Sequence, residues 1–320
     1  MRDRFDRDID YIRFSITDRC NLRCQYCMPQ GVPLGCHQDL LTFEEFLQVA
    51  QAAVELGVTR FKVTGGEPLV RRGCLDFLRR LKALPGVEQV TLTTNGVLLA
   101  PLVPALKAMG LDGVNISLDD PTPAGFRAIT GFDLLPLVLE GLSACVAAGI
   151  RTKLNCVLLP GCEERLPAMA AFAQSQPVDV RFIEVMPIGE GARHPGPTQE
   201  QALAILRRRW PDLHPVEEIR GNGPAHYYAS AGLIGRIGMI DAVSHKFCGG
   251  CNRVRLTSTG VLKPCLCYGE GADLRAVLRG GAPGELKQVL AAAIWNKPQA
   301  HCFDSGASIT EHKNMSEIGG

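Results

Sequence analysis

Three cysteines near the start of the chain are spaced closely enough to share one inorganic cluster. They are Cys20, Cys24 and Cys27, in a C-x3-C-x2-C arrangement. Three thiolates on one short loop can hold three corners of a cubane [4Fe–4S] cluster, whereas a fourth cysteine would close the cluster as an electron carrier. An iron without a protein ligand leaves room for a small molecule to chelate it, as the open position of a catalytic zinc site does. The spacing therefore favours a catalytic cluster.

Zinc and disulfide sites are the alternatives for this loop. A zinc ion could use the three cysteines together with His37, ten residues after Cys27. Paired cysteines can also form disulfides, chiefly in oxidising compartments. Structural zinc loops usually present C-x2-C pairs, so the trio suits a cluster better than zinc.

A second group of cysteines lies near the end of the chain. Cys248, Cys251 and Cys265 form C-x2-C-x13-C, again three thiolates, and Cys267 follows two residues later. With Cys267 included, the pattern also suits a four-cysteine structural zinc site. If residues 261–267 form a strand, Cys265 and Cys267 share one face, so orientation does not exclude Cys267. Spacing alone leaves the cluster and zinc interpretations open here.

The elements that must position these groups alternate between strands and helices from residue 11 to about residue 190. Short β-branched runs predict the strands, and longer periodic stretches between them predict helices. The clearest helix begins at Thr42, where Glu45 completes a capping box, and ends before Gly57. The six predicted strands are residues 11–17, 60–64, 89–94, 113–118, 152–158 and 179–184.

Six strand–helix units in series imply right-handed crossovers and a parallel sheet. Eight units would close a TIM barrel, so six predict an α/β fold with an incomplete (β/α)6 TIM-like barrel. Polar and glycine-rich groups follow three of the strands, at residues 64–68, 93–96 and 117–119. Such groups point into the catalytic mouth of a barrel of this kind.

The composition is that of an ordinary globular protein of 320 residues, with 46% hydrophobic and 21% charged residues. A net charge of +1 gives no global field for nucleic acid or an anionic membrane. The charged N-terminus lacks an apolar signal region, and no apolar stretch approaches a membrane span, so a cytoplasmic location is expected. In a reducing compartment, thirteen cysteines argue for metal or cluster ligation rather than disulfides.

The motifs together resemble one family. The first cysteine loop, with Tyr26 before its third cysteine, resembles that of the radical S-adenosylmethionine (SAM) enzymes. Cys251-Asn-Arg253-Val-Arg255 within the second group, with the terminal Ile318-Gly-Gly320, is similar to the GTP 3′,8-cyclase family of molybdenum cofactor biosynthesis. The resemblance covers nearly the whole chain and includes residues 11–18, 63–69 and 181–184.

The resemblance implies a lyase with two [4Fe–4S] clusters and SAM as cofactors. It would convert GTP to (8S)-3′,8-cyclo-7,8-dihydroguanosine 5′-triphosphate in the first step of the pathway, through a 5′-deoxyadenosyl radical that abstracts the hydrogen at ribose C3′. Residues 1–190 would form the radical SAM partial barrel, and residues 191–320 an iron–sulfur-binding extension with the Gly-Gly tail. The alternatives are a peptide-modifying radical SAM enzyme with an auxiliary cluster and a non-catalytic metalloprotein.

The resemblance also assigns cofactor ligands and SAM contacts. The first trio would hold the cluster that cleaves SAM, and Cys248, Cys251 and Cys265 would hold a second cluster that binds GTP. The residues implied to contact SAM are Tyr26, Gly66, Ser117 and Met186. Gly65 and Gly66 are equally explained by a tight turn that needs a positive φ.

A triphosphate must meet fixed cations, because the chain has no global positive field. The candidates are the charged residues on interior parallel strands, because such strands normally consist of apolar residues. By resemblance Cys20, Cys24, Cys27, Arg253 and Arg255 are catalytic, and Arg181 is a weaker substrate-binding candidate. The implied GTP contacts are Arg13, Lys62, Thr93, Lys153, Arg253, Val254 and Arg255.

Three features depart from the family pattern or have no physical reason in the sequence. Lys62 stands where many relatives are expected to carry arginine, Cys267 is an extra thiol, and the tail Gly319-Gly320 is expected to enter the active site. The expected partners are GTP, an electron donor such as a flavodoxin system and, functionally, the next enzyme, cyclic pyranopterin monophosphate synthase. No nucleic acid or membrane partner is expected, and a homodimer is left open.

Overall fold

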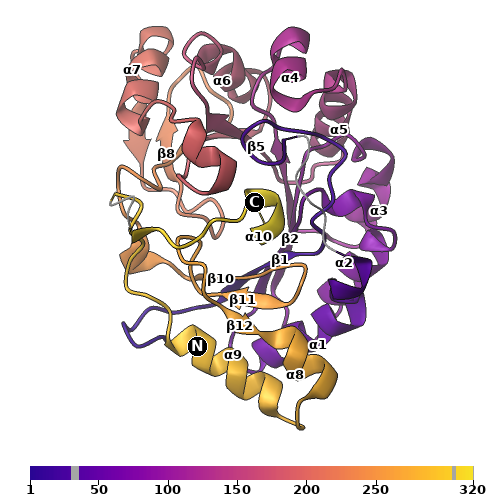
Figure 1. Cartoon of the computed structure of the whole chain (residues 1–320). Coiled ribbons are helices and arrows are strands. Elements are labelled where there is room, and N and C mark those ends of the chain that lie inside the picture. The colour runs from indigo at the N-terminus through magenta and orange to yellow at the C-terminus, as the bar shows by residue number, and fades with distance from the viewer. Residues whose placement is uncertain (30–35, 305–307, 320) are drawn as a thin grey trace.

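The computed structural model describes residues 1–29, 36–304 and 308–319, and these residues form a single sheet with helices around it. Six parallel strands lie in sequence order at its centre (Figure 1). All six predicted strands are confirmed, although the first and fourth end slightly earlier than expected. They are β1 (Tyr11–Ser15), β2 (Arg60–Thr64), β3 (Gln89–Thr94), β4 (Gly113–Ser117), β5 (Thr152–Leu158) and β6 (Asp179–Glu184).

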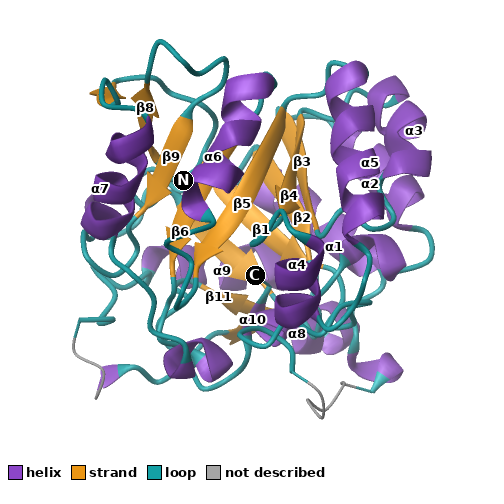
Figure 2. Ribbon diagram, turned by 90° about the horizontal axis from the view of Figure 1, so that it is seen from above, coloured by secondary structure: helices purple, strands orange, loops and turns teal. Residues whose placement is uncertain are grey.

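Helices connect these strands and pack around the sheet (Figure 2). The capping box predicted for the first helix is confirmed, because Glu45 N donates to Thr42 Oγ1 (3.1 Å) and Thr42 N to Glu45 Oε2 (2.6 Å). Gly57, shortly after that helix, has a φ of +87°, as expected for a helix end. The connecting helices are α1 (Phe43–Val54), α2 (Cys74–Lys82), α3 (Val103–Ala108), α4 (Pro123–Thr130), α5 (Leu135–Ala147) and α6 (Leu166–Ser175).

The C-terminal region extends the sheet at both edges. β9 (Ile237–Ile240) pairs parallel with β6, and β10 (Arg253–Leu256) pairs parallel with β1. The strand order runs from β12 to β7 as an open series, which confirms an incomplete barrel. The expected division at residue 190 stays a prediction. The outer strands are β7 (His214–Val216), β8 (His226–Ala229), β11 (Val261–Lys263) and β12 (Ala272–Asp273).

The strand considered over residues 261–267 is shorter than that range. β11 ends at Lys263, directly before Pro264, which has no N–H to donate to a neighbouring strand. The cysteines that follow therefore lie on a loop, and strand alternation does not set where they point. The remaining helices are α7 (Gln199–Arg209), α8 (Leu274–Gly280), α9 (Glu285–Trp295) and α10 (Met315–Ile318), and the 3-10 turns are η1 (His37–Asp39), η2 (Pro68–Val70), η3 (Ala100–Leu102), η4 (Gly189–Arg193) and η5 (Cys248–Gly250).

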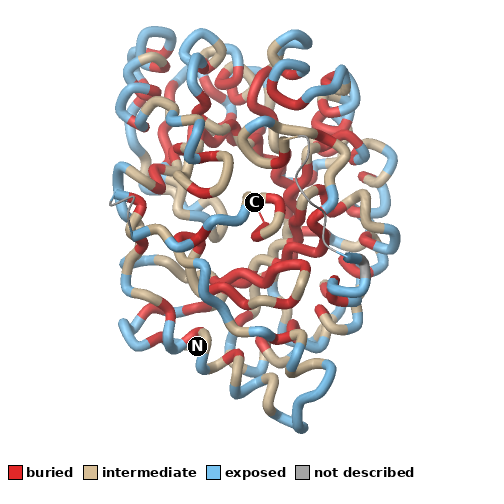
Figure 3. Tube along the Cα trace, viewed as in Figure 1, coloured by how far each residue is buried: buried red, intermediate tan, exposed pale blue. Residues whose placement is uncertain are grey.

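Strand alternation separates the core from the inner face of the sheet. β1 sends Ile12 and Phe14 into the main hydrophobic cluster under the helices, where Phe14 packs against Phe46 with ring centroids 5.2 Å apart. The intervening Tyr11 and Arg13 line a cavity on the other face. Figure 3 shows that the buried parts of the chain lie along the strands. One strand thus supplies both packing energy and site residues.

A smaller hydrophobic cluster holds the C-terminal end of the chain against the barrel. Ile318 of α10 packs there with Ile188, Leu266 and Phe303. The C-terminus consequently lies near the middle of the molecule in Figure 1. Among the described helices, none is by itself long and apolar enough to cross a membrane, and one pair, α4 with α5, passes that test only together and with a 106° bend.

Candidate active site

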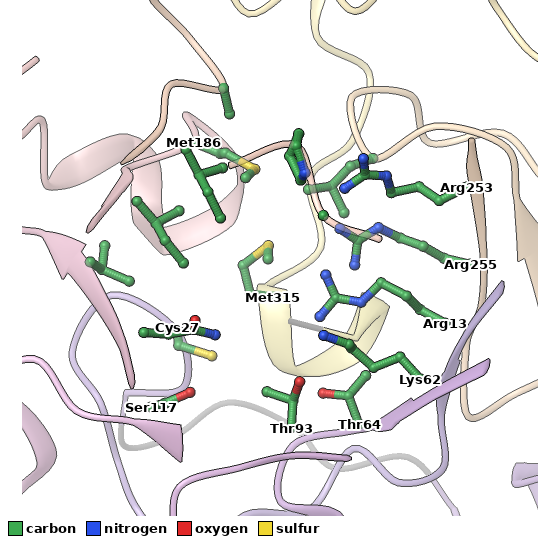
Figure 4. Close-up of a pocket in the computed structure, with 18 of the residues that line it drawn as sticks. Arg13, Cys27, Lys62, Thr64, Thr93, Ser117, Met186, Arg253, Arg255 and Met315 are labelled. Atoms are coloured by element: carbon green, nitrogen blue, oxygen red, sulfur yellow. The ribbon is translucent and has the colours of Figure 1, made fainter. Parts of the chain in front are cut away.

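One cavity inside the curve of the sheet gathers most of the predicted site residues (Figure 4). Cations from β1, β2 and β10 point into it from one side, and Cys27 and Ser117 lie on the opposite side. Of the candidates, Lys153 and Val254 do not line it. Those that do are Arg13, Cys20, Cys24, Tyr26, Cys27, Lys62, Gly66, Thr93, Ser117, Arg181, Met186, Cys248, Cys251, Arg253, Arg255 and Cys265.

The first cysteine loop is a compact turn. The amides of Cys27 and Met28 both donate to the Cys24 carbonyl oxygen, at 3.0 and 2.8 Å, so the loop curls around its own cysteines. Burial raises the pKa of Cys27 to about 12, and burial with the nearby Asp119 carboxylate raises the pKa of Cys24 well above its usual value. Binding of a positively charged metal would therefore favour the thiolate forms of these cysteines.

Tyr26 is anchored to the segment that follows β4. Its hydroxyl donates to Asp119 Oδ2 (2.8 Å), and Asp119 Oδ1 accepts from the Val157 amide (2.8 Å). Asp119 is 7% exposed and lies just after β4. The carboxylate thus ties the cysteine loop to the ends of β4 and β5, which is a positioning role that the sequence motifs did not assign to it.

Gly65 and Gly66 must be glycines because another part of the backbone lies very close to them. Neither residue has a positive φ, so the explanation by a turn that needs a positive φ is wrong. A Cβ on Gly65 would lie 2.7 Å from the Thr17 carbonyl oxygen, and one on Gly66 would lie 2.4 Å from that of Arg19. Gly66 N donates to the Thr17 carbonyl oxygen at 2.6 Å. The glycines let this loop lie directly against the segment that leads into the first cysteine trio.

Glu67 holds the loop after β3 from inside the protein. Its carboxylate is 1% exposed and accepts from Leu69 N (3.0 Å), Thr94 Oγ1 (2.7 Å) and Asn95 N (2.6 Å). Asn95 Nδ2 in turn donates to Asn21 Oδ1 (2.7 Å), beside Cys20. Burial raises the pKa of Glu67 to about 7, and the three donors oppose that shift.

Replacing Glu67 by glutamine is expected to destabilise the fold by about 1–3 kcal/mol, because an amide cannot accept from donors on both sides and leaves a buried N–H without a partner. Urea unfolding followed by circular dichroism measures the change. Glu140→Gln, on the exposed face of α5, is the matched control and should change stability by less than about 0.5 kcal/mol. Equal stabilities of the two variants would contradict this role.

The cations form a row across neighbouring strands. In the strand register Arg13 lies opposite Lys62 on β2 and opposite Arg255 on β10. Burial, followed by repulsion from Arg181 and the other cations, lowers the pKa of Lys62 well below its usual value. Such a concentration of buried like charge is favourable only when an anion binds to it.

Lys153 and Val254 depart from the predicted arrangement. Lys153 lines a smaller neighbouring cavity together with Lys62 and Arg181, rather than the main one. Its ammonium donates to Tyr227 Oη (2.8 Å) and to the Arg220 carbonyl oxygen. Val254 packs in the main hydrophobic cluster, because alternation along β10 turns it away from the face of Arg253 and Arg255, so only its backbone could contact a ligand.

The second trio lines the same cavity, and Cys251 lies near Arg253. Burial raises the pKa of Cys251, but the charges of Lys297 and Arg253 outweigh burial, and its net pKa is lowered. Within the described residues, no three His, Cys, Asp or Glu side chains converge closely enough for one metal ion, so both trios present separated thiols. The side chain of His37, considered above as a zinc ligand, lies outside what the structure describes.

Cys267 turns away from the second trio. Its Sγ lies 2.9 Å from Cys302 Sγ, and its side chain is fully buried in the smaller hydrophobic cluster. Cys265, two residues earlier, lines the cavity. The loop after Pro264 thus separates the two thiols that a continuous strand would have placed on one face.

The C-terminal tail enters the site through Arg255. Arg255 Nη1 donates to the Gly319 carbonyl oxygen at 2.6 Å. Gly319 has a φ of +85°, and a Cβ there would lie 2.8 Å from Ser15 Cβ, so the position requires glycine. Gly320 lies outside the described residues. The expected approach of the tail is therefore confirmed as far as Gly319.

Two family models match the chain. The one described as the Radical SAM superfamily matches residues 14–173, and the one described as Molybdenum Cofactor Synthesis C matches residues 178–303. The GTP 3′,8-cyclase of Heliobacterium modesticaldum is 46% identical over 328 residues, covering 100% of both chains. The chain belongs to the GTP 3′,8-cyclase family. The GTP 3′,8-cyclase of Moorella thermoacetica is similarly 42% identical over 326 residues, again covering 100% of both chains.

Solved structures of radical SAM proteins share the fold. Streptococcus suis SuiB bound to S-adenosylmethionine has a TM-score of 0.64 at 12% identity, covering 97% of this chain and 77% of SuiB. The protein anSMEcpe with bound AdoMet has a TM-score of 0.59 at 14% identity, covering 90% of this chain and 81% of that one. At these identities the likeness establishes the radical SAM α/β fold alone.

Several residues at the site of this GTP 3′,8-cyclase family member received no individual role from the motifs, although residues 93–96 and 117–119 were expected at the mouth. Asp119, Asn95, Lys297 and His301 line the cavity, yet none belongs to a spaced set of ligands. Asn115 and Asn155, which accept from the Arg181 guanidinium at 2.8 and 2.6 Å, are polar residues on interior strands. That placement is the same signal that identified the cations, and it could have found both asparagines.

Proposed function

We propose that this chain is a radical SAM enzyme that converts GTP to (8S)-3′,8-cyclo-7,8-dihydroguanosine 5′-triphosphate, the first step of molybdenum cofactor biosynthesis. The observation that carries the proposal is that both cysteine trios and the row of buried cations line one cavity. A radical generator, a base-binding centre and a phosphate-binding wall can then act on a single substrate molecule.

The radical SAM family implies a [4Fe–4S] cluster and SAM. The first trio fits such a cluster, because its three thiols share one tight loop and Tyr26 is held beside them by Asp119. When bound, the cluster and SAM would supply the radical that takes the hydrogen from ribose C3′. The part of the chain is to hold the ligands, with Gly66, Ser117 and Met186 lining the SAM side of the cavity.

Cys248, Cys251 and Cys265 would hold a second cluster with one iron open to the guanine base. Its support is the position of the trio next to Arg253, whose guanidinium carbon lies 5.4 Å from the Phe247 ring centre. A base placed there would extend its ribose toward the first trio and its phosphates toward the strands. The second cluster, rather than zinc, is part of this proposal.

The cation row would bind the triphosphate. Arg13, Arg253 and Arg255 offer guanidinium forks that suit phosphate oxygens, and Thr93 offers a hydroxyl. Lys153 would act from the neighbouring cavity, through its place beside Lys62 and Arg181. Burial of these groups excludes water and strengthens each contact.

An anaerobic assay with SAM, GTP and dithionite tests the proposal on iron-reconstituted protein. Mass spectrometry should find 5′-deoxyadenosine together with a 3′,8-cyclised product derived from GTP, and no cyclised product when ATP replaces GTP. 5′-Deoxyadenosine without a GTP product would overturn the substrate assignment. Neither product, with zinc bound in place of iron, would overturn the radical SAM assignment as well.

Binding of GTP at pH 8 is expected to take up protons, because a triphosphate beside Lys62 raises a pKa that burial and Arg181 hold low. Affinity should therefore fall as pH rises through the pKa of Lys62 in the complex. Lys153, whose pKa burial lowers to about 7, should contribute in the same direction. Lys62→Arg should take up fewer protons, since a guanidinium stays charged.

Anaerobic titration calorimetry in two buffers of different ionisation enthalpy counts these protons. Lys107→Arg, at an exposed position of α3, is the control and should bind GTP with the wild-type proton count. Equal proton uptake by wild type and Lys62→Arg would show that Lys62 does not meet the phosphates.

The proposed partners follow from the reaction. One-electron reduction of the first cluster needs a low-potential donor such as a flavodoxin system, and the cyclised nucleotide would pass to cyclic pyranopterin monophosphate synthase. Oxygen-sensitive clusters and thirteen cysteines suit the reducing cytoplasm, which we propose as the location. A homodimer stays a hypothesis that size-exclusion chromatography with light scattering would test.

A further inference from the structure

Lys297 is a buried lysine at the second cysteine trio that no motif identified. It follows the end of α9, is 3% exposed and lines the cavity together with Cys248, Cys251 and Cys265. Its ammonium donates to the Pro264 carbonyl oxygen, directly before Cys265, and its positive charge favours the thiolate of Cys251. A single ammonium thus lies at the start of the Cys265 loop and near Cys251.

The segment that carries Lys297 is fixed in place. Arg7 Nη1 donates to the carbonyl oxygens of Cys248 (2.9 Å) and Gln299 (2.8 Å), and Arg7 Nη2 donates to that of Pro298 (2.7 Å). Arg7 is itself held by Asp3 at 2.6 Å, in an ion pair whose side chains are 6% and 0% exposed. The backbone that follows Lys297 is therefore held against the backbone of Cys248.

The same segment contacts the trio at a second place. The amide of His301 donates to Cys248 Sγ at 3.4 Å. Residues 297–301 therefore approach the second trio through both the Lys297 side chain and the His301 amide. Hydrogen bonds to cluster sulfurs from a fixed outer shell are a means by which proteins set cluster potentials.

The surroundings of the Lys297 ammonium differ from those of two other lysines in this region. Among the described residues, no aspartate or glutamate lies within ion-pair distance of its ammonium, unlike Lys263, which pairs with Glu311, or Lys246, which pairs with Asp304 at 2.8 Å. A buried charge needs a counter-charge. The thiolates of the trio are the negative groups in its reach.

We propose that Lys297 is the counter-ion of the second cluster, which favours the reduced cluster over the oxidised one and so raises its reduction potential. The inference rests on the proposed function, in which the second trio holds a [4Fe–4S] cluster. Reduction adds one negative charge to the cluster, and a fixed cation in a dry site stabilises that added charge. Lys297 is a positioning and tuning residue, and Arg253 and Arg255 remain the groups that meet the substrate.

The test uses full-length protein in which Cys20, Cys24 and Cys27 are alanine, so that only the second cluster contributes a signal. After anaerobic reconstitution, a redox titration followed by electron paramagnetic resonance measures the midpoint potential. Lys297→Met should shift the potential to more negative values, and Lys297→Arg should keep it near that of the parent. A Lys297→Met protein with the parent potential and equal iron content would overturn the proposal.

Lys246→Met is the matched control. Lys246 lies near Cys248, but its side chain is 39% exposed and paired with Asp304, so water and the carboxylate screen its charge. Its removal should leave the potential almost unchanged. An equal shift in Lys246→Met and Lys297→Met would show that burial of Lys297 is not decisive, and would overturn its special role.

Loss of cluster in the variants is also informative. If Lys297→Met and Lys297→Gln lose iron while Lys297→Arg retains it, the counter-ion role stands, because arginine keeps the positive charge and the neutral donor of glutamine does not replace it. Loss in all three, including arginine, would overturn a role of charge. If the parent with Lys297 intact binds zinc and no iron, the second cluster itself fails, and that failure is distinct from one at Lys297.

Discussion

Cys24→Ala is expected to abolish formation of 5′-deoxyadenosine, with a loss beyond the detection limit of the assay. The first trio has three thiols for three irons, so removing one leaves a site that cannot hold a cubane cluster with a single open corner. Cys24 is also the residue around whose carbonyl oxygen the loop folds. Iron content and SAM cleavage, measured anaerobically with dithionite and GTP, should fall together.

Cys36→Ala is the control that shows the effect of removing a cysteine outside the cavity. Cys36 is exposed and does not line the cavity. That variant should keep wild-type iron content and turnover. Detection of 5′-deoxyadenosine from the reconstituted Cys24→Ala protein at the wild-type rate would disprove the assignment of the first cluster.

Arg255→Ala is expected to weaken GTP binding by roughly 30-fold or more, while SAM binding stays unchanged. Truncating one partner of a buried, hydrogen-bonded charge pair typically costs about 2–5 kcal/mol. Arg255 is 8% exposed and lies in the register row with Arg13. Anaerobic equilibrium dialysis with GTP and with SAM measures the two affinities separately.

Two further variants show whether that loss reflects phosphate recognition. Arg255→Lys keeps a charge but loses the fork, so its affinity should lie between those of wild type and Arg255→Ala. Arg127→Ala, whose side chain is 68% exposed on α4, should bind GTP as wild type does. If SAM affinity falls as far as GTP affinity in Arg255→Ala, the residue supports the cavity as a whole through Gly319 and not the triphosphate alone.

Local patterns in the sequence predicted the central barrel well. β-Branched runs and the capping box of α1 depend on residues close together in the chain, so the six strands and α1 lay almost where expected. Cations on strands were also informative, because Arg13 and Lys62 occupy positions that packing alone would fill with apolar side chains.

Features that depend on distant parts of the chain could not be predicted in the same way. The contact of Lys297 with the second trio arises only when the segment after α9 folds back, and nothing in a lone lysine distinguishes it from a solvated one. Cys267 shows the same limit, because a single proline changes where it points. Lys153 was placed on the right strand, but the Arg220 carbonyl oxygen and Tyr227 draw its ammonium into a separate cavity.

The pairing of β10 with β1 imposes an order on biosynthesis. Asn252 Nδ2 donates to Asp10 Oδ1 (2.8 Å) across 242 residues, at the point where the two strands come together. The ribosome therefore releases the first cysteine loop early, with one edge of β1 still unpaired. On the proposed function, a chain that stops before β10 would carry the first cysteine trio but lack Arg253 and Arg255. Completion of the last parallel strand would then be the event that adds these proposed phosphate ligands to the site.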